Sequence, residues 1–130
     1  MRTRIGALVA IVAVAALALG GCSTQARAER KGKKAGTEIC RAKNADNANA
    51  AQRHVQRATN AINDLARFTG RDVKEDVRDL DRNLNQMSRG NATSQDVNAI
   101  ERSVQEARSS AHGNAAAGYD GMLEALADCD

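Results

Sequence analysis

Apolar residues recur at alternating steps of three and four along most of the chain after position 47, the spacing of one helix face. We call each such series of apolar residues a seam. The first seam predicts a helix that ends at Phe68-Thr69-Gly70, where glycine takes the usual C-terminal capping place. Its members are Ala48, Ala51, Val55, Ala58, Ile62 and Leu65. A second seam follows Asp72 and Glu75, a capping-box-like pair, and stops at Gly90-Asn91. Its members are Val73, Val77, Leu80, Leu84 and Met87.

Two further seams fill the rest of the chain. The third has Thr93 or Ser94 as its N-cap and Asp96 in its first turn. Its members are Val97, Ile100, Val104, Ala107 and Ala111. The fourth is out of phase with the third and contains Ala115, Tyr119, Met122, Leu126 and Cys129. The phase shift and the pair Gly113-Asn114 favour two helices, and one kinked helix from Ser94 to Asp128 is the alternative.

These seams predict an all-α protein, a small up-down bundle of four helices, with three helices as the alternative. The composition agrees, because the chain has no Pro, no Trp and only two aromatic residues among 130. We expect a disulfide between Cys40 and Cys129, the two cysteines left once Cys22 is assigned to another role below. A bond between the start and the end of a bundle favours four helices, because an even number of passes brings both ends together.

The N-terminus has the pattern of a secretory signal. Arg2 and Arg4 precede an uncharged, apolar stretch from Ile5 through Leu19, which at about 15 residues is short for a membrane span of about 20. The stretch closes with Leu19-Gly20-Gly21-Cys22, which resembles the lipobox of bacterial lipoproteins. The resemblance implies cleavage before Cys22 and acylation of Cys22, which anchors the chain in the cell membrane on its extracytoplasmic face. An uncleaved single-helix anchor and an ordinary secreted protein are the alternatives.

Charge divides the remaining chain. Residues 23–43 contain seven basic and two acidic residues, whereas residues 44–130 contain ten basic and fourteen acidic ones. We therefore predict a signal peptide at 1–21, a lipidated, basic and flexible tether at 22–36, and a helical bundle domain at 37–130. The tether is expected either to contact anionic lipid or to serve as a solubilising spacer. Nucleic acid is not expected as a partner, because a lipidated protein faces away from the cytoplasm.

Residues that could carry chemistry are few. His54 and His112 lack any partner at metal-ligand spacing, so no metal and no cofactor is predicted. The carboxylates after Asp72 alternate with basic residues, which is typical of a solvated helix face. No nucleophile motif is present, and we expect no enzymatic activity and no catalytic residue.

A partner surface is predicted around Tyr119, Met122 and Leu123, beside a stretch of small residues from Gly113 to Gly121. The sequence thus predicts a non-enzymatic, membrane-anchored lipoprotein of the cell envelope whose helical domain binds an envelope protein. One alternative is a phage-encoded surface lipoprotein that acts in superinfection exclusion. Another is a carrier that holds lipid or haem in a groove between helices.

Overall fold

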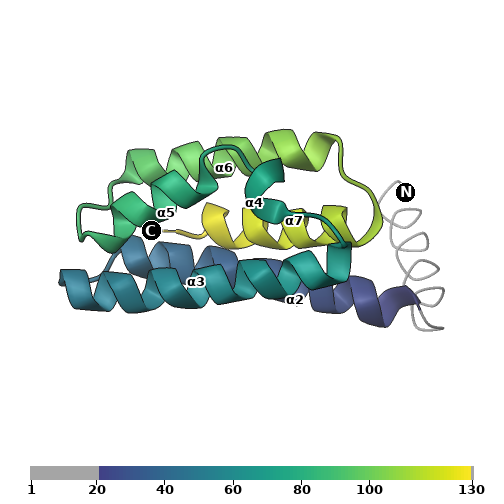
Figure 1. The fold of residues 1–130 in the computed structure, drawn as a ribbon, viewed down its shortest axis with the longest axis horizontal. Coiled ribbons are helices and arrows are strands. Elements are labelled where there is room, and N and C mark those ends of the chain that lie inside the picture. Colours follow the sequence, from purple (N-terminus) through teal and green to yellow (C-terminus); the bar gives the residue numbers. More distant parts are fainter. Residues whose placement is uncertain (1–20, 130) are drawn as a thin grey trace, which may run out of the picture.

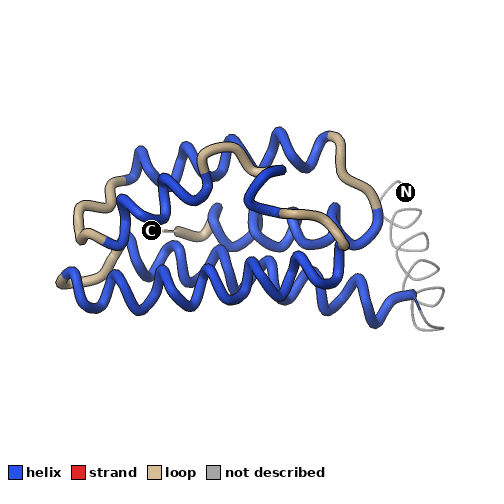
Figure 2. The backbone as a smooth tube through the Cα atoms, viewed as in Figure 1, coloured by secondary structure: helices blue, strands red, loops and turns tan. Residues whose placement is uncertain are grey.

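The computed structural model describes residues 21–129, with side chains from residue 24 onward. Residues 1–20, which carry most of the predicted signal peptide, and the side chain of Cys22 lie outside the described part. Residues 21–129 form only helices, connected by turns and loops (Figures 1 and 2). The helices are α2 (Gly21–Lys43), α3 (Ala48–Thr69), α4 (Val73–Asp76), α5 (Leu80–Ser88), α6 (Ser94–Ser109) and α7 (Gly113–Ala127). Across residues 21–129, no helix combines the length and the apolar character that a membrane crossing requires.

The chain makes five passes along the long axis of the molecule, and each pass runs opposite to the one before it (Figure 1). The passes are α2, α3, the pair α4 and α5, α6, and finally α7. An odd number of passes makes the first and last helices parallel, and α2 and α7 indeed run side by side in the same direction (Figure 1). The all-α class is confirmed. The count of four helices is not confirmed, because residues 21–129 contain six.

Three of the four predicted seams form helices with the expected ends. Asn47 caps α3 by accepting a hydrogen bond from the Ala50 N–H, and Gly70 ends it in the left-handed conformation at φ 67°. Thr93 and Asp96 form a complete capping box at the start of α6. α6 ends at Ser109 and α7 begins at Gly113, so the two C-terminal seams are separate helices.

The second seam was predicted as one helix and is broken in the structure. α4 ends at Asp76, Val77 is extended, and Asp79 adopts φ 60° before α5 begins at Leu80. Aspartate tolerates this left-handed conformation better than most residues. Val77 and Leu80 are both fully buried on either side of the break, so the apolar pattern is satisfied without a continuous helix.

Residues 22–36, predicted as a flexible tether, are helical in the structure. They belong to α2, which runs without interruption from Gly21 to Lys43, so the predicted domain boundary at residue 37 is wrong. Ala28, Ala35 and Ile39 are completely buried along one side of this helix. The segment reads as polar in the sequence because glycine and alanine, rather than large apolar residues, fill its buried positions.

Glycines allow α2 and α7 to approach each other at backbone distance. A Cβ atom at Gly32 would overlap the carbonyl oxygen of Gly118, and one at Gly121 would overlap the carbonyl oxygen of Glu29. A Cβ atom at Gly36 would lie 2.8 Å from a carbonyl oxygen of α7, again too close. Such small residues at four-residue steps are the usual means by which two helices pack closely. The pairing of α2 with α7 therefore depends on the absence of side chains at these positions.

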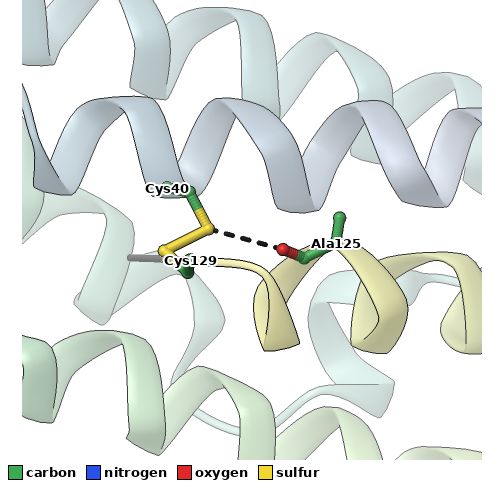
Figure 3. The surroundings of a disulfide bond; sticks show 3 residues. All are labelled: Cys40, Ala125 and Cys129. Carbon is green, nitrogen blue, oxygen red and sulfur yellow. Dashed lines mark hydrogen bonds between the residues drawn. A yellow bond between two sulfur atoms is a disulfide. The ribbon is translucent and has the colours of Figure 1, made fainter.

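A disulfide joins the same two helices at their C-terminal ends. Cys40, in the last turn of α2, is bonded to Cys129, which follows α7, with their Cα atoms 5.2 Å apart (Figure 3). Cys40 Sγ lies 3.6 Å from the Ala125 carbonyl oxygen, a packing contact because a bonded sulfur has no proton to donate. The predicted pairing is confirmed, but Cys40 has a different place in the fold than expected. It lies at the end of α2, a helix that was not predicted, instead of before the first predicted helix.

We predict that Gly32→Ala lowers the free energy of unfolding by about 1–3 kcal/mol, because the new methyl group forces α2 and α7 apart. In an uncrowded helix the same change stabilises the protein by about 1 kcal/mol. The sign of the change in unfolding free energy therefore shows whether α2 and α7 are in close contact at Gly32. Urea unfolding followed by circular dichroism measures the difference. Thr37→Ala, at an exposed position of α2, is the control and should change little. Equal or greater stability of Gly32→Ala would contradict the close packing.

The double variant Cys40→Ser/Cys129→Ser should lose about 4 kcal/mol of unfolding free energy. The bond closes a loop across 89 residues and so restricts the unfolded chain. The urea midpoint of the variant, compared with oxidised and reduced wild type, tests this. Reduced wild type should match the variant. An unchanged midpoint in both would mean that the bond contributes nothing to stability.

Candidate functional site

The predicted anchor lies at one end of the molecule. Cys22 falls in the first turn of α2, and Cys40 lies eighteen positions further along the same helix, about 27 Å away at 1.5 Å per residue. The end of α3 and the loop before α7 reach the same end (Figure 1). Asn114 connects these two segments, because its side-chain N–H donates to the Phe68 carbonyl oxygen at 3.1 Å. An acyl group at Cys22 would therefore adjoin the folded domain directly.

The predicted partner surface is wrong for two of its three residues. Tyr119 is 1% exposed and Met122 is fully buried. Leu123 is half-buried and packs against the same core. These residues are buried because α2 covers this face of α7, where the small residues leave room for it. The sequence pattern did not predict α2. These side chains contribute packing rather than a surface.

The hydroxyl of Tyr119 reaches a polar group at the edge of the core. It donates a hydrogen bond to Oδ2 of Asp76 at 2.9 Å, and the Arg71 guanidinium contacts both oxygens of the same carboxylate at 3.0 Å. Burial of the phenol, together with the hydrogen bond to Asp76 and its negative charge, raises the pKa of Tyr119 well above the ordinary 10.0. This network connects α4 to α7 and explains how a tyrosine is accommodated in the core.

A second polar contact lies between α2 and α3. Glu38, only 3% exposed, has Oε1 3.1 Å from Nδ1 of His54 and 3.5 Å from Nη1 of Arg41. A buried carboxylate is costly unless it is paired, and His54 and Arg41 provide its partners. His54 is therefore a structural residue that satisfies Glu38. His112 lies exposed at the start of α7, where its side chain makes no capping bond.

A shallow hollow of about 270 Å³ lies next to the disulfide, at the end of the molecule far from Cys22. Side chains from the C-terminal ends of α2 and α7 and from the first half of α6 surround it. They are Lys43, Ser94, Val97, Asn98, Glu101, Leu126, Ala127 and Cys129. We call it the distal hollow. Its rim offers one cation, one carboxylate and two neutral polar groups, a set suited to a polar protein surface.

The described residues hold no group of three or more His, Cys, Asp or Glu side chains that could bind a metal ion. Comparison of the chain with known protein families, with curated proteins and with solved structures gives no match. The roles of Glu38 and Asp76 were not predicted from the sequence. Both appear there as ordinary charged residues on helix faces, and only the packing of α2 and the break after α4 give them their partners.

Tyr119 should titrate above its ordinary pKa of 10.0, and its ionisation should accompany alkaline unfolding. The folded protein keeps the phenol proton at pH values where an unfolded tyrosine has lost it. This stabilisation is therefore present below about pH 10 and is lost as the pH rises further. Because Tyr119 is the only tyrosine, phenolate absorbance reports it alone.

Tyr119→Phe is the matched variant. It should lose about 1 kcal/mol at neutral pH together with the hydrogen bond to Asp76, and its stability should fall less steeply above pH 10. A midpoint of Tyr119 at or below 10 in the folded wild type would contradict the buried hydrogen bond.

Proposed function

We propose that this protein is a non-enzymatic lipoprotein of the bacterial cell envelope, anchored through acylated Cys22, whose helical domain binds an envelope protein on the extracytoplasmic face. The observation that carries the proposal is the bonded pair Cys40–Cys129. Disulfides persist in oxidising compartments outside the cytoplasm, which is where the signal-like N-terminus would send the chain. A feature of the sequence and a feature of the fold thus support the same compartment.

The continuity of α2 defines how such an anchor would hold the domain. A flexible tether of 15 residues would let the domain move up to about 50 Å from the membrane. A helix that begins at Gly21 and packs against α7 within a few turns keeps the domain at the lipid surface. The distal hollow would then lie about 27 Å along α2 from the anchor, within reach of a partner in the envelope.

The alternatives differ in what supports them. A carrier of lipid or haem needs a groove between helices, and the side chains of Tyr119 and Met122 are buried in the core rather than exposed along such a groove. Superinfection exclusion by a phage lipoprotein requires the same anchor and the same kind of protein partner, so it is a special case of the proposed function. We favour the general proposal of an envelope-anchored interaction domain.

Cys22 provides the direct test. Intact mass of protein extracted from its native membrane should show a chain that begins at Cys22 and carries acyl chains. Cys22→Ala should be neither acylated nor cleaved before residue 22, because the resemblance to lipoproteins assigns both acylation and cleavage to this cysteine. Cys129→Ser is the matched control, since it removes another cysteine but should keep the acyl mass. An unmodified wild type that starts at another residue would overturn the anchor.

A further inference from the structure

Charge separates the bundle into two layers. Residues 21–69, which form α2 and α3, contain ten basic and four acidic residues, whereas residues 70–129 contain seven basic and eleven acidic ones. α2 and α3 lie side by side along one side of the molecule, and α6 lies on the opposite side (Figure 1). The protein therefore has a basic side and an acidic side, both of them parallel to its long axis.

Most carboxylates of the basic layer are already paired. Asp64 binds Lys31 at 3.1 Å across the contact between α2 and α3. Glu38 is buried against His54, and Glu29 binds Lys33 at 3.5 Å. Lys33 also reaches Glu124 of α7 at 3.4 Å. These pairs use the acidic groups of the layer internally. Arg41 and Arg67 also contact Glu38 and Asp64, at 3.5 and 3.8 Å, but both of these arginines remain exposed, as do the other arginines of the layer and Lys34.

The exposed cations share one face. Arg27, Arg30, Lys34 and Arg41 follow one another on α2 at steps of three, four and seven, so they form a single stripe on the solvent side. Exposed arginines of α3 lie beside this stripe, near the residues that pair with α2. Arg53 and Arg57 lie one residue before and three residues after His54, and Arg67 lies three residues after Asp64. We call these seven exposed cations the basic face.

An apolar feature lies at the Cys22 end of this face. Phe68, the only phenylalanine, is half-buried and borders a shallow hollow of about 360 Å³ with Lys31, Asp64 and Arg67. An aromatic ring between cations is suited to the boundary between lipid headgroups and acyl chains. The combination of one ring and several cations occurs on the same helix pair that begins at Cys22.

We propose that the basic face lies on anionic lipid headgroups beside the Cys22 anchor, so that the domain rests on its α2–α3 side with its acidic layer away from the membrane. This inference rests on the proposed function, because acyl chains at Cys22 would hold the face near the lipid. The guanidinium groups bind phosphate oxygens of the headgroups through charge-assisted hydrogen bonds. The like charge of the acidic layer and the anionic lipid opposes the reverse orientation.

The lipid surface is favoured over nucleic acid as the occupant. Arg27 lies only five residues after Cys22 in the same helix, so an anchored chain meets lipid at once and at high effective concentration. Single-stranded nucleic acid is usually bound through several stacked aromatic rings, and this face offers only Phe68.

Single tryptophans in the full-length protein test the orientation, since the chain has no Trp of its own. Phe68→Trp places the probe on the basic face, and Gln105→Trp places it at an exposed position of α6. Each protein is reconstituted in vesicles of brominated phosphatidylcholine, with or without phosphatidylglycerol. We expect lipid to quench Phe68→Trp strongly when phosphatidylglycerol is present, and to quench Gln105→Trp little in either vesicle.

The charge requirement is tested in the Phe68→Trp background. Arg27→Gln/Arg30→Gln/Lys34→Gln should lower the ratio of docked to undocked protein about a hundredfold. The matched control Arg78→Gln/Arg82→Gln/Arg102→Gln removes the same charge from exposed positions of the acidic layer and should keep the quenching. Equal effects of the two triple variants would overturn the proposal, because net charge alone would then explain binding.

The remaining outcomes separate the two proposals. Intact mass on the same preparations reports acylation, so unacylated protein rejects the anchor at Cys22 independently of the quenching. Acylated protein in which Phe68→Trp is quenched no more than Gln105→Trp rejects the orientation and leaves the anchor in place. Single-stranded DNA and phosphatidylglycerol vesicles are also compared as competitors that release the quenching. If DNA releases it at a lower concentration of charge than the vesicles do, the face binds nucleic acid and the lipid contact is overturned.

Discussion

The close approach of α2 to α7 is the contact on which the rest of the structure depends. Gly32, Gly36 and Gly121 remove the side chains that would separate the two backbones. Each glycine destabilises its own helix by about 1 kcal/mol, so the packing of α2 against α7 must compensate for that loss. Because the helices are parallel, their C-terminal ends meet, and the bond between Cys40 and Cys129 joins them there. The first and last segments of the domain therefore stabilise each other.

The same packing determines which groups remain at the surface. Once one side of α2 is buried against α7 and α3, its lysines and glutamates at the edges find partners, as in Lys31–Asp64 and Lys33–Glu124. Exposed pairs of this kind contribute little to stability, so their main effect is to neutralise the carboxylates of the layer. The cations opposite the buried side stay exposed, although Arg41 among them contacts Glu38 at 3.5 Å. A surface of one charge thus arises from the burial pattern of α2.

Large apolar residues made most of the fold predictable. The seams through Leu65, Ile100 and Met122 gave the right helices, because these side chains must be buried and their spacing defines one helix face. α2 was missed because its buried positions hold Ala28, Gly32 and similar small residues, which hydropathy does not distinguish from a polar linker. The proposed partner surface failed for the same reason, since a helix absent from the prediction covers it. The disulfide was predictable because the expected oxidising compartment and the number of cysteines left one pairing.

Amide hydrogen exchange along α2 tests the central claim most directly. If residues 26–36 form a helix packed against α7, their amides should exchange as slowly as those of residues 115–126, because both segments open only when the bundle opens. Exchange of residues 26–36 within the shortest labelling time, with α7 still protected, would show that this segment is a free tether. That result would remove both the close packing of α2 and the basic face that depends on it.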